Sequence, residues 1–171
     1  FRSGGGMMDC VLDDALAIDP KVLRSALGHF ATGVTIVTTT TSSGAVGITV
    51  NSFASVSLDP PLVLWSIDRQ GSRYDTFRSA EHYALNILGA EQADLSYQIV
   101  KNASDFSDVN LEENTQGVPI IPDCVAVFEC RQADVYRGGD HDIILGQVEA
   151  LRTKEGGALG FFKGKMTTIS E

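Results

Sequence analysis

Residues 34–50 read VTIVTTTTSSGAVGITV, which is two β-branched runs joined by a short polar segment. β-Branched side chains are restricted in helices and pack well on a pleated sheet. The joining segment, TSSG at 41–44, has the small polar residues and the glycine that are typical of a turn. The stretch therefore predicts an antiparallel hairpin with strands at 34–40 and 45–50.

Further strands and a few helices are predicted along the rest of the chain. Short apolar or alternating runs indicate strands at 62–67, 83–88, 124–136 and 142–151. Helices are expected at 72–80, capped by Ser72 and Asp75, and at 91–101, with a long surface loop at 102–122. The regular β-α-β alternation of a parallel sheet is missing, so the pattern favours a mainly β fold, an antiparallel barrel with peripheral helices.

An amphipathic helix is expected before the hairpin. Asp19 and Pro20 form a helix start, because Asp accepts hydrogen bonds from the first N–H groups and Pro lacks the donor that would stay unpaired there. The helix is expected to end at Gly33. Its apolar residues recur at helical spacing and predict one buried face, made of Leu23, Ala26, Leu27 and Phe30. The aromatic residues expected in the core are Phe30, Trp65 and Phe128.

The composition excludes several classes of protein. The 171 residues contain 13 Lys and Arg against 22 Asp and Glu, a formal charge of −9, which is the wrong sign for binding the phosphates of nucleic acid. Neither an apolar run of roughly 18 residues nor a signal peptide is visible, so we expect a cytoplasmic protein with no membrane partner. We take residues 1–8 as an expression remnant and disordered leader, and residues 9–171 as a single domain.

Several well-known site signatures are missing from the sequence. It contains no Gly-x-Gly-x-x-Gly turn, no Gly-Lys-Ser/Thr loop and no Gly-x-Ser-x-Gly elbow, which argues against a Rossmann domain, a phosphate-binding loop and a serine hydrolase. The histidines and cysteines lack metal-site spacing: His29, His82, His141, Cys10, Cys124 and Cys130. Cys124 and Cys130 would lie roughly 20 Å apart on one strand, too far for a disulfide. We therefore expect buried free thiols and no metal.

A dense run of small polar side chains follows the predicted hairpin, GITVNSFASVSLDPP at 47–61. Its hydroxyls and amide could hydrogen-bond the polar edge of a flat heterocycle, or the run could be only an edge strand and a turn. Ser72 is either a helix cap or, beside Arg69 and Arg73, part of a phosphate seat at a helix start. His141, in a Gly-Gly-Asp-His turn, is either a surface residue or a functional imidazole at the end of the sheet.

Taken together, these segments resemble the short-chain flavin reductase family, the reductase partners of two-component flavin-dependent monooxygenases. The markers occur in order between residues 23 and 164: FATGV at 30–34, TVNSFASVS at 49–57 followed by Asp59-Pro60-Pro61, Ser72 after Asp68-Arg69, and Gly139-Asp140-His141. The chain departs from the family near its end, where FFKGKM at 161–166 lacks the usual aromatic after the glycine. We therefore assign no role to the C-terminal tail.

The resemblance implies a homodimeric, Greek-key-like split β-barrel that binds FMN or FAD near the subunit interface and takes hydride from NADH. The reduced flavin would then diffuse to a partner flavin-dependent monooxygenase. The implied flavin contacts are Thr49, Asn51, Ser52, Ser55 and Val56, and the implied ribityl or phosphate contacts are Ser66, Arg69 and Ser72. The implied nicotinamide-side motif is Gly139-Asp140-His141, in which His141 is the catalytic residue that orients the nicotinamide.

Three alternatives stay open at this point. A non-catalytic flavin-binding split barrel would share the flavin contacts but would need no Gly139-Asp140-His141 turn. An oxidase of the pyridoxamine-phosphate type would need a cluster of basic residues for its substrate, and the sequence shows none. A structural barrel that binds another protein would bind no flavin at all.

Overall fold

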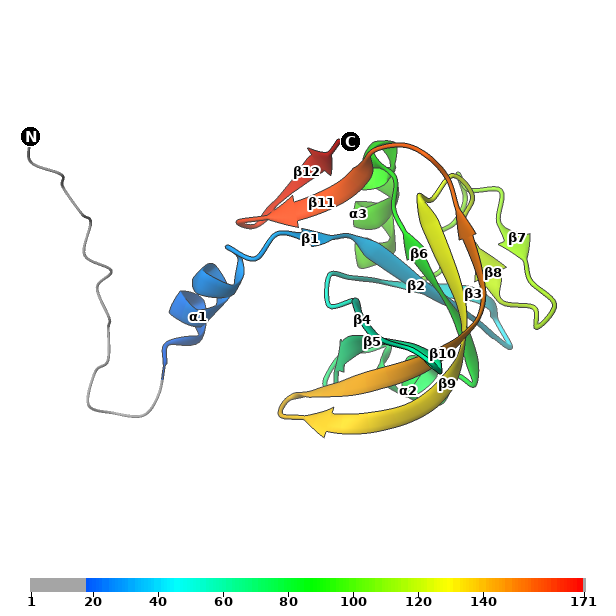
Figure 1. Cartoon of the computed structure of the whole chain (residues 1–171), viewed down its shortest axis with the longest axis horizontal. Helices are drawn as coiled ribbons and strands as arrows, with labels where there is room; N and C mark the ends of the chain where they lie inside the picture. The colour runs from blue at the N-terminus through cyan, green and yellow to red at the C-terminus, as the bar shows by residue number, and fades with distance from the viewer. Residues whose placement is uncertain (1–17, 171) are drawn as a thin grey trace, which may run out of the picture.

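β-Strands make up most of the computed structural model, which describes residues 18–170 (Figure 1). The helices are α1 (Pro20–Leu27), α2 (Tyr74–Arg78), the 3-10 helix η1 (Ala90–Gln92) and α3 (Ala93–Lys101). The strands are β1 (Thr32–Gly33), β2 (Thr35–Thr41), β3 (Gly44–Val50), β4 (Ala54–Leu58), β5 (Pro61–Asp68), β6 (His82–Ile87), β7 (Glu112–Glu113), β8 (Pro119–Ile120), β9 (Ala126–Gly138), β10 (His141–Thr153), β11 (Ala158–Phe162) and β12 (Lys165–Ile169). The predictions for residues 1–8 and Cys10 lie outside the described residues.

All strand pairs of the described residues are antiparallel, as the sequence predicts. The main sheet has the order β3-β2-β6-β9-β10-β5-β4, and a second sheet has the order β1-β11-β12. The hairpin predicted from residues 34–50 is confirmed, because β2 pairs with β3 from Thr35 opposite Val50 to Thr41 opposite Gly44. The two strands of this hairpin therefore begin and end within a residue or two of their predicted limits.

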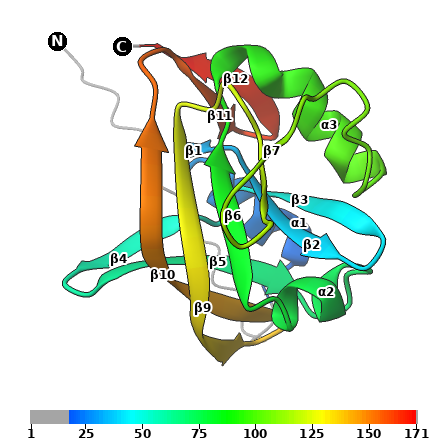
Figure 2. The same ribbon diagram turned by 90° about the vertical axis from the view of Figure 1, so that its right-hand side faces the viewer.

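The long hairpin of β9 and β10 connects the two halves of the main sheet. Its outer end pairs β6 with β9, and its inner end pairs β10 with β5 (Figure 2). Register shifts between Leu145 and Gly146 and between Val148 and Ala150 interrupt the β10 ladder. Such bulges bend a strand and increase its twist, so the hairpin can turn from one half of the sheet to the other. This bend brings β5 and β4 across the base of the barrel.

Two clusters of buried side chains form the core, and Trp65 lies in one of them, fully buried. Phe128 is partly buried and packs against the same cluster, stacking on Phe53. The prediction that Phe30 lies in the core is wrong, because 78% of its surface is exposed. Phe30 follows α1 at a point where the chain has left the barrel, so no core surface is within reach.

The opening helix begins as predicted but ends early. Asp19 is the N-cap and accepts a hydrogen bond from the N–H of Lys21 at 2.7 Å, with Pro20 in the first turn. The helix ends at Leu27, and the predicted end at Gly33 is wrong because Thr32 and Gly33 pair with β11. No residue of α1 is buried, so the face predicted to be core is exposed instead. In Figure 1, α1 projects from the barrel beside the turn of β11 and β12.

The predicted cap at Ser72 is also wrong. Helix α2 begins only at Tyr74, and its N-cap, Arg73, makes no side-chain capping bond. Ser72 lies instead in the loop between β5 and α2, where Gly71 N–H donates to the carbonyl of Asp68. This local turn ends β5 and uses the residues that a longer helix would need.

The segment predicted as a surface loop at 102–122 is partly buried. It contains β7 and β8, and it contributes four buried residues to one core cluster: Phe106, Val118, Ile120 and Ile121. The buried amide of Asn86 holds it, since its Oδ1 accepts from the N–H of Ile121 at 3.0 Å. The hairpin of β11 and β12, which the sequence reading leaves unassigned, pairs with β1 along the same edge.

The prediction of free, buried thiols is confirmed for the cysteines that the structure describes. Cys124 and Cys130 are both free and buried. Burial raises the pKa of each thiol to about 12. Both side chains therefore stay protonated and act as small apolar groups in the core.

The close packing of β10 generates a stability prediction. A Cβ added at Gly146 would overlap the hydroxyl of the fully buried Tyr83 and come within 3.2 Å of the Cys130 Cβ. We expect Gly146→Ala to lower the free energy of unfolding by about 1–3 kcal/mol, measured by chemical denaturation. Gly33→Ala is the control, because nothing lies within 4 Å of its Cβ position. Equal stability of both variants would contradict the packing described.

Candidate functional site

Two serines predicted as cofactor contacts are hydrogen-bonded to each other's strand. The Ser52 hydroxyl donates to the carbonyl of Ser66 at 3.2 Å and accepts from its N–H at 2.9 Å. This pair of bonds fixes the loop after β3 against β5. Asn51 precedes the bonded serine and is exposed, so its amide is free to meet a ligand on that loop.

The pairing of β5 with β10 places the predicted nicotinamide turn beside the predicted phosphate contacts. His141 lies opposite Asp68, and Ile143 lies opposite Ser66. One residue beyond β5, the N–H of Arg69 donates to the carbonyl of Asp140 at 3.1 Å. Two segments that are about seventy residues apart in the sequence therefore share one edge of the sheet.

The turn at 138–141 is a tight hairpin connection. Gly138 pairs with His141, and Gly139 has a φ of +73°, a conformation that glycine adopts without strain. The His141 ring is 43% exposed, and its Nδ1 lies 2.8 Å from the carboxylate of Asp140. This hydrogen bond, followed by the charge of the imidazole, lowers the pKa of Asp140. The carboxylate thus stays ionised and holds the ring at the tip of the sheet.

Ser72 lines a cavity of about 250 Å³ between β5, the loop before α2 and the end of α3. Its other lining residues are Ile48, Ile67, Asp68, Gly71, Arg73, Tyr74 and Val100. The guanidinium of Arg73 donates to the carbonyls of Ile99 and Val100 at 2.8 and 3.0 Å. Arg73 therefore anchors α3 and lines the cavity with a cation that is already engaged.

A buried carboxylate that the sequence analysis missed joins these parts. Asp142 is 6% exposed, and its two oxygens lie 3.6 Å from Arg69 Nε and 3.5 Å from Arg78 Nε. The hydroxyl of Tyr74 donates to the same carboxylate at 2.6 Å. Strand alternation carried a signal for it, because Asp142 precedes buried Ile144 by two residues and shares its face. An acidic residue at a core-facing position needs such partners.

Three predicted flavin contacts lie further from this cavity. The hydroxyl of Thr49 donates to the carbonyl of Ser96 on α3 at 3.1 Å and ties β3 to that helix. Ser55 and Val56 are exposed on β4, the edge strand of the main sheet, and the register shift between Ser55 and Ser57 makes Val56 a bulge. The structure thus brings Ser66, Arg69, Asp140 and His141 together and leaves the β4 pair at the rim.

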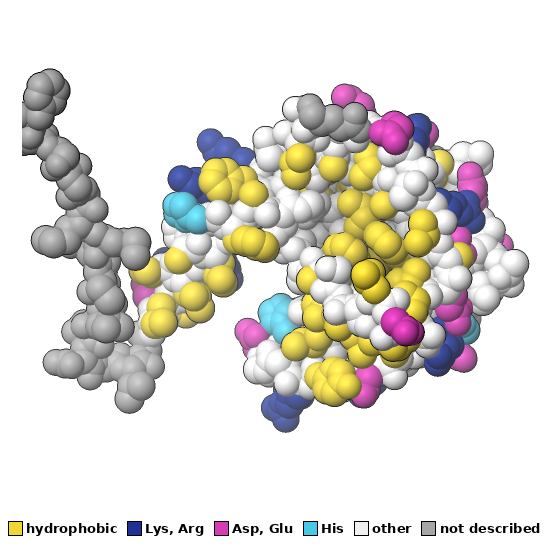
Figure 3. All heavy atoms as spheres, viewed as in Figure 1, with side chains coloured by type: hydrophobic (Ala, Val, Ile, Leu, Met, Phe, Trp, Pro, Cys, Tyr) yellow, Lys and Arg dark blue, Asp and Glu magenta, His cyan; other side chains and the backbone are white. Residues whose placement is uncertain are grey.

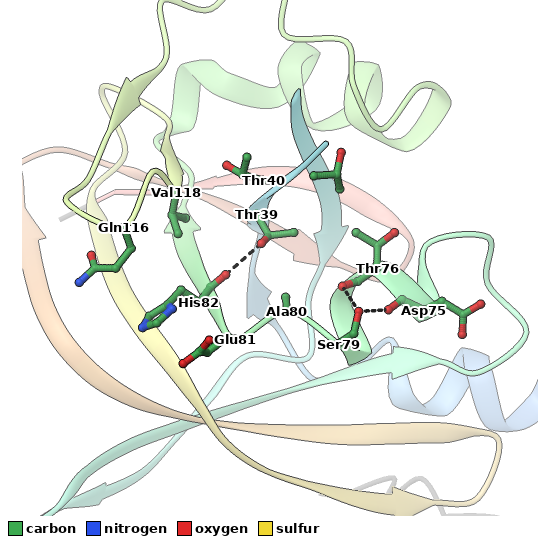
Figure 4. A pocket seen from close by; sticks show the side chains of 11 residues that line it. Thr39, Thr40, Asp75, Thr76, Ser79, Ala80, Glu81, His82, Gln116 and Val118 are labelled. Atoms are coloured by element: carbon green, nitrogen blue, oxygen red, sulfur yellow. Dashed lines mark hydrogen bonds between the residues drawn. The ribbon is translucent and has the colours of Figure 1, made fainter. Parts of the chain in front are cut away.

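A larger cavity, of about 600 Å³, lies away from every predicted site residue (Figure 4). Hydroxyls line it, but Thr39 donates to the carbonyl of His82 and Ser79 donates to the carbonyls of Asp75 and Thr76. These donors stabilise the walls rather than facing a ligand. Among residues 18–170, no group of three or more His, Cys, Asp or Glu side chains could hold a metal ion.

Comparison with known proteins identifies the family. The family described as flavin reductase like domain matches residues 27–170. The chain belongs to this flavin reductase family. FMN reductase (NADH) SmoA of Agrobacterium fabrum is 50% identical over 150 residues, which cover 88% of this chain and 86% of SmoA. The flavin-dependent monooxygenase reductase subunit HsaB of Mycobacterium tuberculosis is 36% identical and covers 78% of this chain, which spans 72% of HsaB.

Solved structures of flavin reductases confirm the predicted split-barrel fold. The NADH:FAD oxidoreductase SgcE6 of Streptomyces globisporus, solved with NAD and FAD fragments, matches with a TM-score of 0.82 and 34% identity. The match covers 91% of this chain and 98% of SgcE6. Some other relatives are longer, and this flavin reductase chain spans 48% to 64% of three of them.

The residues of this flavin reductase fit the flavin that the family implies. Ile48 and Ile67 supply an apolar wall, and the Ser72 hydroxyl opens into the same cavity. Asn51 lies exposed on the adjoining loop, and Arg69 stands at its far side. Apolar walls with a few placed polar groups are what a heterocycle with a polar tail requires.

The carboxylate of Asp142 generates a prediction about stability. Asp142→Asn would leave Arg69 and Arg78 without their counter-charge, so we expect a loss of about 1–3 kcal/mol in the free energy of unfolding. The upper part of the range for buried pairs is not expected, because these arginines are 36% and 46% exposed. Tyr74→Phe should cost about 1 kcal/mol. Chemical denaturation measures both variants.

Asp123→Asn is the matched control for this prediction. It removes a carboxylate that is 74% exposed and pairs with Lys154, so the expected loss is below about 1 kcal/mol. Asp123 has a φ of +63°, which Asn tolerates. If Asp142→Asn unfolds at the same denaturant concentration as this control, the buried carboxylate does not stabilise the fold as described.

Proposed function

We propose that the chain reduces FMN or FAD with NADH and releases the reduced flavin to a partner flavin-dependent monooxygenase. The observation that carries the proposal is the juxtaposition of β5 and β10. It places the serine hydroxyls of the flavin side within one strand of the turn that contains His141. Two ligands that lie against these two segments would lie against each other.

The relatives support the predicted enzyme class and cofactors. SmoA is named as an NADH-dependent FMN reductase, and SgcE6 was solved with NAD and FAD fragments. HsaB is named as the reductase subunit of a flavin-dependent monooxygenase. The predicted NADH-dependent flavin reductase is therefore confirmed at the level of the family, and the non-catalytic flavin-binding alternative is not favoured.

The flavin and NADH supply the redox chemistry, which is the transfer of a hydride between them. The chain's own residues have to hold both ligands in contact and in the correct orientation. We assign flavin contacts to Asn51 and Ser52 on the loop after β3, with Thr49, Ser55 and Val56 around its edge. Ser66, Arg69 and Ser72 are assigned to the ribityl or phosphate end. Arg69 can serve there because the Asp142 carboxylate is shared with Arg78, which leaves this cluster a net positive charge.

His141 is assigned to the nicotinamide side together with Gly139 and Asp140. Gly139 allows the tight turn, and Asp140 orients the imidazole through the 2.8 Å contact. The ring is exposed at the tip of the sheet, where it can donate a hydrogen bond to a bound ligand. We assign it the orientation of the nicotinamide, since hydride transfer requires no protein acid.

We also propose a homodimer in the cytoplasm, with residues 9–171 as a single domain. No helix among residues 18–170 is long and apolar enough to cross a bilayer. The exposed apolar side chains of α1 support the homodimer, since Val22 and Leu27 are 58% and 64% exposed. The family match over residues 27–170 supports one domain.

The direct test of the proposed function is a steady-state matrix of NADH or NADPH against riboflavin, FMN and FAD. We expect NADH oxidation that depends on added flavin and that is faster with NADH than with NADPH. Absorbance at the nicotinamide band measures the rate. Flavin binding without NADH oxidation would favour the non-catalytic barrel, and no flavin binding would leave only the structural barrel.

His141→Ala tests the assignment on the nicotinamide side. We expect kcat/KM for NADH to fall roughly tenfold or more, because a small displacement of the reacting atoms is costly. The Kd of FMN should stay unchanged. His82→Gln is the control, since His82 pairs with Glu149 and lines the separate large cavity. Unchanged turnover and an unchanged NADH KM in His141→Ala would remove the imidazole from the mechanism.

A further inference from the structure

The free positive charges of the chain are gathered in one place. Most described arginines are engaged by carboxylates or carbonyls, as Arg69, Arg73 and Arg152 are. Within residues 18–170, the Lys and Arg side chains without an ion pair or a side-chain hydrogen bond are Lys21, Arg24, Lys101, Arg137, Lys163 and Lys165. All but Lys101 and Arg137 lie on α1 or on the turn of β11 and β12.

These charges surround a pocket of about 450 Å³ between α1 and the β11–β12 turn. Its lining residues are Lys21, Arg24, Ser25, Gly28, His29, Lys163 and Gly164, none of which is acidic. We call Lys21, Arg24 and Lys163 the basic cluster. Figure 3 shows Lys and Arg side chains beside hydrophobic ones where α1 meets this turn. In a chain of net charge −9, a local group of unneutralised cations indicates an anionic partner.

Helix α1 has no surface of its own chain to cover it. It has eight residues, none of which is buried, and it is held through Gly28, whose carbonyl accepts from the N–H of Lys163 at 2.8 Å. A helix this short is marginal without tertiary packing. Its apolar side chains, including Val22 and Leu27, remain more than half exposed. The helix therefore requires a second molecule to bury its apolar face.

The flavin site of the same chain is incomplete in the complementary way. The cavity at Ser72 has about 250 Å³, less than the roughly 300–1,000 Å³ of pockets that enclose small ligands. Both arginines beside it are engaged, Arg69 by Asp142 and Arg73 by the end of α3. A flavin phosphate would bring two further negative charges to this place. The site thus lacks volume and free positive charge, which the basic cluster has in surplus.

The placement of the two features allows one copy to supply the other. In Figure 1, α1 and the β11–β12 turn project on the same side of the barrel as the β9–β10 turn that contains Gly139 and Asp140. In a twofold dimer the same patch meets itself, so a contact made on this side is made twice, once in each direction. A second copy can therefore cover α1 while its own α1 reaches the first copy's flavin site.

We propose that the basic cluster of one copy binds the phosphate group of the flavin held by a second copy. This rests on the proposed function and assigns to Lys21, Arg24 and Lys163 a role in a shared site. The second copy also buries the apolar face of α1. Each flavin is then held by the serines of one chain and by the cations of its partner.

The first test measures flavin affinity without turnover. The variant Lys21→Gln, Arg24→Gln, Lys163→Gln should raise the Kd of FMN roughly tenfold and leave the Kd of riboflavin unchanged, measured by quenching of flavin fluorescence. Lys101→Gln is the control, because it also removes an unpaired cation. An unchanged FMN Kd overturns the proposal, and so does a change confined to the KM of NADH with riboflavin as acceptor.

The second test asks whether the two halves of the site belong to different chains. Ser72→Glu places a carboxylate in the cavity and should weaken FMN binding in its own homodimer. A heterodimer of Ser72→Glu with the triple variant, purified through two different tags, has one intact site if the site is shared. We expect titration calorimetry to find one FMN per heterodimer with the wild-type Kd. If both groups act within one chain, no site of wild-type affinity is found, and the proposal is overturned.

Two wild-type measurements separate this proposal from the proposed function. Light scattering that gives a monomer at assay concentration overturns the shared site but leaves flavin reduction intact. A wild-type chain that binds no FMN overturns both. A wild-type dimer that oxidises NADH with FMN, while the triple variant keeps its FMN Kd, overturns only the shared site.

Discussion

The antiparallel pairing of β5 with β10 is the constraint on which the site depends. It runs from His141 opposite Asp68 to Gln147 opposite Leu62. A shift of one residue would turn every side chain of β10 to the opposite face of the sheet. Asp142 would then leave its contacts under α2, and His141 would point into the core. The buried Ile144 on one face and the bulges of β10 prevent such a shift, so the packing of the core also sets the geometry of the site.

Local pattern predicted the sheet well and its periphery poorly. The β-branched run at 34–40 and the apolar run at 62–67 define their strands because burial and propensity agree there. The end of α1 depended on Thr32 and Gly33 pairing with β11, residues far away in the sequence. The buried segment at 118–121 contains few residues and follows polar ones, so no periodicity marked it. The partners of Asp142 come from the loop before α2 and from α2 itself, which only the tertiary structure places there.

The electrostatics of the chain show how an acidic protein can hold an anionic ligand. Its carboxylates neutralise most of its arginines in pairs, such as Arg131 with Glu149 and Arg152 with Glu129. At Asp142 one carboxylate is shared by two guanidiniums, which leaves a local excess of positive charge beside the loop of Ser72. Pairing elsewhere therefore matters as much as net charge, because only the unneutralised groups create a field that a phosphate can use.

A flavin site shared between two chains would couple the cofactor to the assembly of the dimer. A ligand that contacts both chains stabilises the dimer by its binding free energy, and by linkage the dimer binds that ligand more tightly than the monomer does. Reduced flavin would then leave a site whose walls are held together by its own phosphate contacts. Exposed cations such as Arg24 and Lys163 form weak, solvent-screened contacts, which suit a reductase that must release its product. The serines, buried between β3 and β5, would provide the specificity, and the partner's cations would set the lifetime of the complex.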